Sequence, residues 1–346
     1  MSKRTIISIA IACLTLSPVS ADTVKGPARW IGRTDIASKR FAWPGSGVEL
    51  RFIGTRAEIT LIDDGNNSVM VELDGQANRL DLANGRKTYM LAENLEQGAH
   101  TIRLTRRTEG QLGPTQFVDA ITDGTFVGAG TPEKQIVVIG DSISAGYGIE
   151  GKSHTCAFSP DTENQYLTYA AIAARSFGAE ITTLAASGRG ASINADGTLN
   201  GTLPQLMDRT MPFDDAPLAN AEEAGRPDVI VVHLGTNDFG NKRRPKTFEK
   251  DYGHLLAKLR AAHPDAIIYA AIGPMLDQYD FPIARDSIAE IVSARVNSGD
   301  KSLHKLVFEP GIGGIGCDWH PDTEANIEMA RQLEAAIIRD LGWNIR

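Results

Sequence analysis

The hydrophobic pattern of this chain changes its period near residue 130, and this change constrains the fold more than any other feature. Between residues 30 and 126, apolar residues alternate with polar ones, as at Val48, Leu50 and Phe52. A period of two is typical of half-buried strands, and turn signals such as Asp74-Gly75 separate the runs. Many short strands without intervening helices predict an all-β sandwich of jelly-roll type.

After the segment Gly128-Ala129-Gly130-Thr131-Pro132, compact apolar runs alternate with helical patterns. The runs are short and rich in β-branched residues, which is typical of buried parallel strands. They comprise Ile136–Ile139, Ile181–Ala186, Val229–Leu234, Ile267–Ile272 and Leu306–Phe308. This order predicts a doubly wound α/β sheet with right-handed crossovers.

Three of the intervening helices can be delimited from their patterns. Thr162 and Gln165 resemble a capping box, which predicts a helix from this point to Gly178. Apolar residues at helical spacing predict a second helix from Phe248 until His263-Pro264 stops it, and a third from near Thr323 to Gly342.

The N-terminus is typical of an export signal. Lys3 and Arg4 precede a mostly apolar run, and Val19-Ser20-Ala21 forms a small-residue cleavage site. The apolar run is far shorter than the ~20 residues that span a bilayer, which disfavours a membrane anchor. We therefore divide the chain into a signal peptide at residues 1–21, a β-sandwich at residues 22–130 and an α/β domain at residues 131–346. The mature protein is expected to be secreted or periplasmic.

Composition supports a globular, exported protein. Hydrophobic residues make up 42% of the chain and charged residues 23%, enough apolar surface for real cores. Cleavage removes Lys3 and Arg4, so the formal net charge changes from −8 to −10, and no basic cluster remains to bind nucleic acid. Cys156 and Cys317 are the cysteines left after cleavage, and in an oxidising compartment an even pair is more often bridged than free. We predict a disulfide between them, with two buried free thiols as the alternative.

Polar clusters follow the predicted strands at the edge where an open α/β sheet binds ligands. They are Gly140-Asp141-Ser142, Ser187-Gly188-Arg189-Gly190, Gly235-Thr236-Asn237-Asp238 and Cys317-Asp318-Trp319-His320-Pro321. Taken singly, Ser142 reads as a helix cap, Asn237 as an Asx turn and His320 as an ordinary histidine. Together the clusters supply a nucleophile, backbone donors, an amide donor and a base, so their combination favours a catalytic site.

These residues carry a resemblance to the SGNH, or GDSL, hydrolases, whose four blocks contain a serine, a glycine, an asparagine and a histidine. Ser142, Gly188, Asn237 and His320 match those blocks in order. More narrowly, the chain resembles carbohydrate esterase family 2, in which a jelly roll precedes the SGNH domain. The segments that carry this narrower likeness are Trp43-Pro44-Gly45-Ser46-Gly47, Cys156-Ala157-Phe158-Ser159, Thr162-Glu163-Asn164, Gly235-Thr236-Asn237-Asp238-Phe239 and Cys317-Asp318-Trp319-His320-Pro321.

The expected chemistry follows from the residue types. His320 would take the proton of Ser142 as its oxygen attacks an ester carbonyl, and water would then cleave the acyl-enzyme. The backbone N–H groups of Ser142 and Gly188, with the side-chain amide of Asn237, would stabilise the oxyanion. Many SGNH enzymes orient the histidine with an aspartate three residues before it, where this chain has Cys317. Asp318 is the nearest acid and our candidate orienter, and a backbone carbonyl is the alternative.

The substrate region departs from similar enzymes, because the segment before Ser187 lacks their tryptophan and residues 211–225 are alanine-rich and acidic. Trp319 and Tyr147 are candidates for stacking on a sugar ring, and Asp238 is a further substrate-binding candidate.

The resemblance implies a secreted serine esterase that removes O-acetyl groups from xylan- or mannan-type polysaccharides or derived oligosaccharides. The alternatives are a lipid esterase or thioesterase of the same superfamily, and a carbohydrate-binding protein without catalysis. The sequence contains no metal-ligand spacing and no phosphate-binding glycine-rich loop, so we expect no metal and no cofactor. The expected partner is acetylated carbohydrate, with no nucleic acid and no membrane in the mature form.

Overall fold

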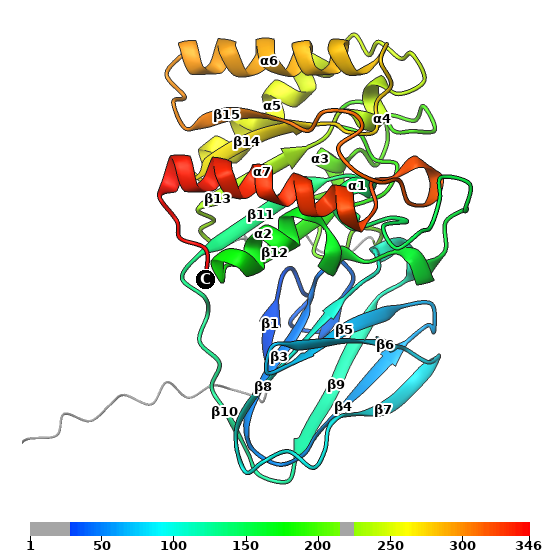
Figure 1. Ribbon diagram of the computed structural model, residues 1–346, viewed down its shortest axis with the longest axis vertical. Coiled ribbons are helices and arrows are strands. Elements are labelled where there is room, and N and C mark those ends of the chain that lie inside the picture. Colours follow the sequence, from blue (N-terminus) through cyan, green and yellow to red (C-terminus); the bar gives the residue numbers. More distant parts are fainter. Residues whose placement is uncertain (1–27, 215–224) are drawn as a thin grey trace, which may run out of the picture.

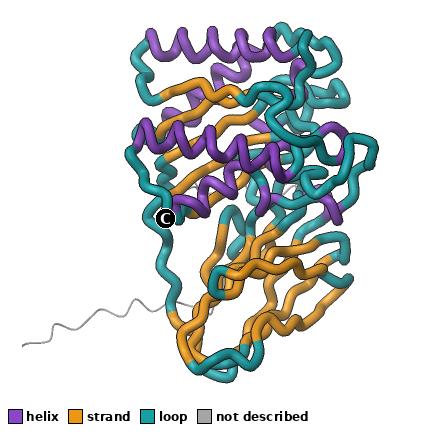
Figure 2. The backbone as a smooth tube through the Cα atoms, in the orientation of Figure 1, coloured by secondary structure: helices purple, strands orange, loops and turns teal. Residues whose placement is uncertain are grey.

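The computed structural model describes residues 28–214 and 225–346, so the predicted signal at residues 1–21 lies outside the described residues. An all-β part and an α/β part pack end to end, with the strands of the first gathered below the helices of the second (Figures 1 and 2). The predicted all-β sandwich and parallel α/β sheet are confirmed.

The all-β part consists of two antiparallel sheets. The first has the order β1-β3-β8-β5-β6, with β10 also pairing with β3, and the second has the order β2-β9-β4-β7. Their bounds are β1 Ala28–Ile31, β2 Arg40–Phe41, β3 Gly47–Gly54, β4 Ala57–Asp63, β5 Ser68–Leu73, β6 Gln76–Asp81, β7 Gly85–Ala92, β8 Gly98–Arg106, β9 Thr115–Thr122 and β10 Thr125–Val127. Val48, Leu50 and Phe52 all point into the shared core, as their alternation predicts.

The α/β part is built on one parallel sheet with the order β12-β11-β13-β14-β15. Its elements are β11 Gln135–Gly140, α1 Ser142–Ala145, α2 Tyr169–Phe177, β12 Glu180–Ala185, α3 Leu203–Leu206, β13 Val229–His233, α4 Thr236–Phe239, α5 Phe248–Ala262, β14 Ile267–Ile272, α6 Phe281–Asn297, β15 Leu303–Val307 and α7 Thr323–Leu341. Helices α2 and α7 bury one face of the sheet, and α5 and α6 bury the other. Among the described residues, no helix is long and apolar enough to cross a membrane.

One predicted helix begins later than its sequence pattern indicates. Thr162 and Gln165 do not open an α-helix, because residues 160–162 and 165–167 form two separate 3₁₀ helices, η2 and η3. Helix α2 begins only at Tyr169, after Thr168, and ends as predicted at Gly178 in the left-handed conformation. The capping-box prediction is wrong because Asn164, not Thr162, caps the next helical turn: its side chain accepts a hydrogen bond from Tyr166 N–H at the start of η3.

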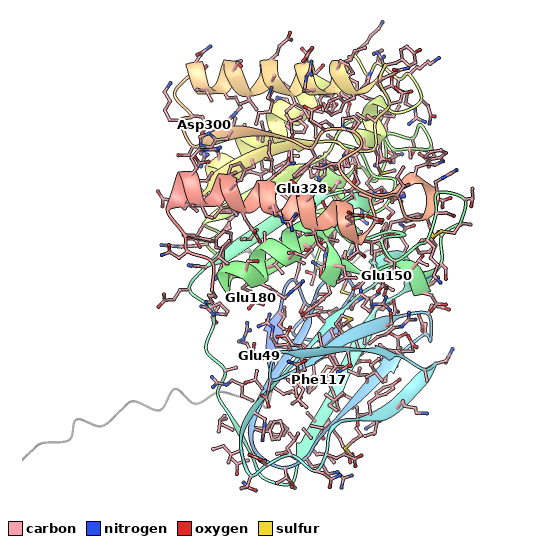
Figure 3. All side chains as sticks on the ribbon, viewed as in Figure 1. Glu49, Phe117, Glu150, Glu180, Asp300 and Glu328 are labelled. Carbon is pink, nitrogen blue, oxygen red and sulfur yellow. A yellow bond between two sulfur atoms is a disulfide. The ribbon has the colours of Figure 1, made fainter. Side chains whose placement is uncertain are left out.

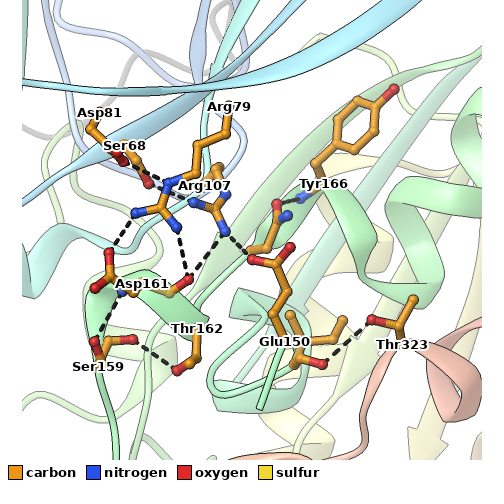
Figure 4. Close-up of polar contacts among 12 residues, drawn as sticks. Ser68, Arg79, Asp81, Arg107, Glu150, Ser159, Asp161, Thr162, Tyr166 and Thr323 are labelled. Carbon is orange, nitrogen blue, oxygen red and sulfur yellow. Dashed lines mark hydrogen bonds and ion pairs between the residues drawn. The ribbon is translucent and has the colours of Figure 1, made fainter. Parts of the chain in front are cut away.

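The two parts are joined by buried and charged contacts. Trp43 of the sandwich packs in the core of the α/β part and donates a 3.0 Å hydrogen bond to the carbonyl of Thr210. Arg29 bridges Glu49 and Glu180, which lie at the junction of the two parts (Figure 3). Arg79 forms a 2.5 Å ion pair with Asp161 in the segment before α2 (Figure 4). These contacts hold the sandwich against the α/β sheet, and we propose that the domain boundary lies near residue 130.

Candidate active site

The strand order places the chain's polar clusters at a topological switch point. The connection after β11 leads to its neighbour β12 on one side, whereas β13 lies on the other side of β11. The carboxyl ends of adjacent parallel strands therefore diverge into loops with a crevice between them. Ser142 follows β11, Gly188 follows β12 and Asn237 follows β13, and all three residues line one cavity of about 580 Å³ with His320.

Ser142 occupies the first position of a short helix and is not itself the cap. Asp141 caps α1, because its Oδ1 accepts a 3.1 Å hydrogen bond from Ile143 N–H. Burial raises the pKa of Asp141 to about 7, assisted by the neighbouring charges of Asp238 and Glu109. This arrangement presents the Ser142 hydroxyl at the end of β11 while the cap satisfies the first turn of the helix.

His320 is in contact with Ser142 although 178 positions separate them. Its Nε2 lies 2.8 Å from Ser142 Oγ, and its Nδ1 lies 3.0 Å from the carbonyl oxygen of Asp318. Because a carbonyl only accepts, Nδ1 carries the hydrogen and Nε2 is free to accept the serine proton. Burial lowers the pKa of His320 to about 4, so the imidazole is neutral and able to act as a base above that pH.

The carboxylate of Asp318 makes no hydrogen bond to His320, which bonds to backbone carbonyls instead, and this corrects our prediction that this side chain orients the base. The carboxylate instead accepts a 2.7 Å hydrogen bond from the Tyr147 hydroxyl and a 3.0 Å bond from Phe158 N–H. The backbone at Asp318 and Trp319 is left-handed, with φ of 48° and 65°, so the Asp318 carbonyl faces the histidine while its side chain faces away. The geometry is that of a Ser–His dyad supported by backbone carbonyls.

The predicted disulfide is present and fixes the loop that carries His320. Cys156 and Cys317 are bonded across 161 positions, with their Cα atoms 4.7 Å apart. Two backbone bonds flank the bridge, from Cys317 N–H to the carbonyl of Gly148 and from Asp318 N–H to the carbonyl of Cys156, each 3.0 Å long. The histidine loop is thereby tied to the segment that follows α1.

The candidate oxyanion donors face the same cavity as the Ser–His pair. Gly188 has a φ of 76°, a left-handed conformation that favours glycine. The N–H groups of Ser142 and Gly188 donate no backbone hydrogen bond to any described residue. The side-chain amide of Asn237 donates a 3.1 Å hydrogen bond to the carbonyl of Arg189 and a 3.3 Å hydrogen bond to the Asp141 carboxylate. These bonds hold the Asn237 side chain at the cavity wall, and its oxyanion role stays a prediction.

The structure gives Asp238 surroundings that differ from those of the substrate-binding residue that we predicted. Its side chain is fully buried, and its carboxylate accepts hydrogen bonds from the N–H groups of Ala191, Ser192 and Ile193 at 2.7–3.0 Å. The carboxylate thereby satisfies the hydrogen-bonding capacity of three buried backbone N–H groups in the segment after Gly188. Asp238 therefore anchors this loop and is not among the residues that line the cavity.

The two aromatic candidates occupy different positions. Tyr147 lines the cavity, packs against the His320 ring at a centroid distance of 4.2 Å and stacks on Phe158 at 4.5 Å. Trp319 is 60% exposed and stacks on His154 at 4.1 Å. It lines a smaller adjacent cavity that shares Met275 with the Ser142 cavity.

Several cavity residues are not among the site residues that we predicted from the sequence. Glu109, Gln111 and Leu112 come from the sandwich, at the 3₁₀ helix η1 Gly110–Leu112, and line the same cavity as His320. Phe158 comes from the loop after Cys156. Only the docking of the two parts brings the three sandwich residues to the site, so no pattern along the chain identifies them, whereas Phe158 belongs to a segment that carries the family resemblance.

Comparisons with known proteins match both parts of the chain. The family model described as carbohydrate esterase 2 N-terminal matches residues 30–129, and that of the GDSL-like lipase/acylhydrolase family matches residues 138–305.

Two curated proteins are similar along most of the chain. The cellulase/esterase CelE of Acetivibrio thermocellus is 36% identical over 324 residues, which cover 90% of this chain but only 39% of that relative's length. The acetylxylan esterase / glucomannan deacetylase of Cellvibrio japonicus is 28% identical over 309 residues, covering 86% of this chain and 84% of the relative.

Solved structures match the whole arrangement. A family two carbohydrate esterase from Clostridium thermocellum in complex with cellohexaose superimposes with a TM-score of 0.87 at 35% identity, covering 91% of this chain and 99% of that one. A carbohydrate esterase family 2 enzyme with a carbohydrate-binding domain from Corynascus thermopiles has a TM-score of 0.83 at 30% identity, covering 91% and 100%. The likeness therefore includes both parts and their connection.

Proposed function

The chain belongs to carbohydrate esterase family 2, and from this premise we propose that it is a serine esterase that removes O-acetyl groups from plant polysaccharides of the xylan or mannan type, or from their oligosaccharides. The observation that carries the proposal is the 2.8 Å contact between His320 Nε2 and Ser142 Oγ in a cavity open to solvent. The relatives, a cellulase/esterase and an acetylxylan esterase / glucomannan deacetylase, support acetylated carbohydrate as the substrate.

In the proposed reaction His320 Nε2 accepts the proton of Ser142 as Oγ bonds to the ester carbonyl carbon. The tetrahedral intermediate collapses when the carbon–oxygen bond to the sugar breaks and His320 returns the proton to the sugar oxygen. Water then attacks the acetyl-serine by the same route and releases acetate. The N–H groups of Ser142 and Gly188 and the amide of Asn237 serve as oxyanion donors, each typically worth 10²–10³-fold in rate.

The sugar is expected to lie across the open side of the cavity. The exposed face of Trp319 offers an apolar platform next to His320, and aromatic rings stack on the apolar side of sugar rings. Tyr147 shapes the wall around the acetyl group, since its hydroxyl is already bonded to Asp318 and its ring packs on His320.

Acetate release from defined acetylated mono-, oligo- and polysaccharides tests the proposal. We expect release from acetylated xylan or mannan oligosaccharides by the wild type and a loss of at least about 10³-fold in Ser142→Ala, because that variant lacks the nucleophile. Full activity of Ser142→Ala would contradict the assignment. An ester panel in which long acyl chains or thioesters react faster than acetyl sugars would favour the lipid esterase or thioesterase alternative.

We also propose that the protein is exported and that its mature form begins at Asp22. The Cys156–Cys317 disulfide supports this, because such bonds persist in oxidising compartments. N-terminal sequencing of the protein recovered from an expressing cell's periplasm or medium tests it, and an intact N-terminus there would refute cleavage after Ala21.

A further inference from the structure

Two buried glutamates, Glu109 and Glu163, lie next to each other at the junction of the two parts, and Glu109 contacts the loop that carries Gly188. Glu109 immediately precedes η1 of the sandwich, and Glu163 immediately follows η2 of the α/β part. Glu109 is 2% exposed and Glu163 is not exposed at all. The carboxyl group of Glu163 lies next to that of Glu109, and neither of its oxygens has a hydrogen bond of regular geometry within the described part of the chain.

Glu109 makes the contact that reaches the reaction site. Its Oε2 accepts a 2.7 Å hydrogen bond from Ser187 N–H and a 3.1 Å bond from the Gln111 side chain. Ser187 directly precedes Gly188, so this bond fixes the peptide that leads into the proposed oxyanion donor. The backbone carbonyl of Glu109 in turn accepts a 3.1 Å bond from the buried guanidinium of Arg106. A rigid chain of contacts thus runs from the sandwich core to the Gly188 loop.

Two adjacent buried carboxylates repel each other, so their burial favours a single negative charge on the pair. Glu109 accepts hydrogen bonds from two N–H groups, those of Ser187 and the Gln111 side chain, whereas the Glu163 carboxyl group faces the backbone and side chain of Glu109. Burial and the charge of Glu109 raise the pKa of Glu163 well above its usual range. Within the described part of the chain, Arg106 is the cation that attracts both carboxyl groups. Burial and, to a smaller extent, the charge of Glu109 also raise the pKa values of Asp141 and Tyr147.

We propose that Glu109 is a positioning residue of the esterase: its carboxylate holds Ser187 N–H and so aims the Gly188 N–H at the oxyanion, while Glu163 stays neutral and donates a hydrogen bond to it. The inference rests on the proposed function, since it assigns a cause to the oxyanion geometry. It also gives the sandwich a part in the reaction, because the positioning carboxylate belongs to the other fold unit.

The first test compares Glu109→Ala, Glu109→Gln and a control. Glu109→Ala removes the acceptor for Ser187 N–H, and we expect kcat on an acetyl ester to fall roughly 10–100-fold with KM unchanged. Glu109→Gln keeps an oxygen for that N–H, so it should recover most of the loss. Glu72→Ala is the matched control, because Glu72 also joins the two parts, accepting a 2.8 Å bond from the Tyr166 hydroxyl, but does not touch the loop. A kcat for Glu109→Ala equal to that of Glu72→Ala would overturn the proposal.

The second test probes the shared proton through stability. A group whose pKa is raised in the folded state stabilises below its unfolded pKa, and this contribution is lost as pH rises toward the folded pKa. Glu163→Gln keeps the donor and the shape but does not titrate. Its unfolding free energy should therefore increase relative to wild type between pH 5 and pH 9, with kcat retained. A difference that is constant over this range would show that Glu163 carries no extra proton.

A phosphonate probe separates the failure of this inference from that of the proposed function. A p-nitrophenyl alkylphosphonate reacts with Ser142 as the Oγ–phosphorus bond forms and p-nitrophenolate leaves, and the product places an oxyanion at the same donors. The rate of p-nitrophenolate release should fall in Glu109→Ala in parallel with kcat. If the wild type is labelled but deacetylates no sugar, the substrate proposal fails and the probe still tests Glu109. Labelling of Glu109→Ala at the wild-type rate refutes positioning.

Discussion

Replacing Asp318 with asparagine distinguishes a carboxylate-supported triad from the backbone-supported dyad seen in the structure. Asparagine tolerates the left-handed conformation that Asp318 adopts, with a φ of 48°. Its side-chain oxygen also remains available to Tyr147 and Phe158, which the Asp318 carboxylate now contacts at 2.7 and 3.0 Å. The Asp318 carbonyl that accepts the His320 Nδ1 hydrogen is unchanged by the substitution.

The expected magnitude follows from which bond survives. In a triad whose carboxylate sets the histidine tautomer, aspartate to asparagine costs about 10⁴-fold in kcat. Here the tautomer is set by a carbonyl, so only the through-space attraction between the carboxylate and the imidazolium is lost. We expect Asp318→Asn to reduce kcat by less than about tenfold, since such an attraction in a partly hydrated site is worth on the order of 1 kcal/mol.

The assay is hydrolysis of p-nitrophenyl acetate from pH 3.5 to 9, with Ser142→Ala as the inactive control and thermal unfolding to verify the fold. The Asp318 charge raises the His320 pKa, so its removal should move the acidic limb of kcat/KM to lower pH. A loss of 10³-fold or more in a variant that melts like the wild type would refute the dyad.

Three further predictions follow from the structure. Burial lowers the pKa of His320 to about 4, so the wild-type kcat/KM should fall as the pH decreases through about 4. A midpoint of this pH profile above pH 6 would contradict a neutral buried base. Replacing Cys156 and Cys317 together by serine should lower the unfolding free energy by roughly 5 kcal/mol in the chain-entropy account, and an unchanged denaturant midpoint would refute this. Trp43→Ala should cost about 3–5 kcal/mol and expose the junction to proteolysis, whereas wild-type stability would show that the two parts do not depend on this contact.

Sequence periodicity predicts elements well where local pattern and tertiary packing agree. Helices α5 and α7 and strand β14 begin and end within a few residues of their patterns, because each buries one regular face. Helix α6 is not one of the three helices that we predicted from sequence patterns. Its first turn contains Pro282, a residue that is tolerated at that position of a helix. The predicted start of α2 was wrong because side-chain caps in the preceding segment stabilise two 3₁₀ helices, and their sequence resembles the start of an α-helix.

The sequence by itself determined the two fold units, the disulfide partners and the cluster of serine, glycine, asparagine and histidine at one sheet edge. The fold units and the cluster follow from local periodicity and from the rule that parallel strands end at the same edge. The disulfide partners follow from the number of cysteines that remain after the predicted cleavage. Tertiary structure alone decided what supports the base and the loops. Asp318 faces Tyr147, and Asp238 faces backbone amides, because the path of the backbone sets the side-chain direction. The approach of Glu109 from the sandwich depends on docking between distant segments, which no local pattern encodes.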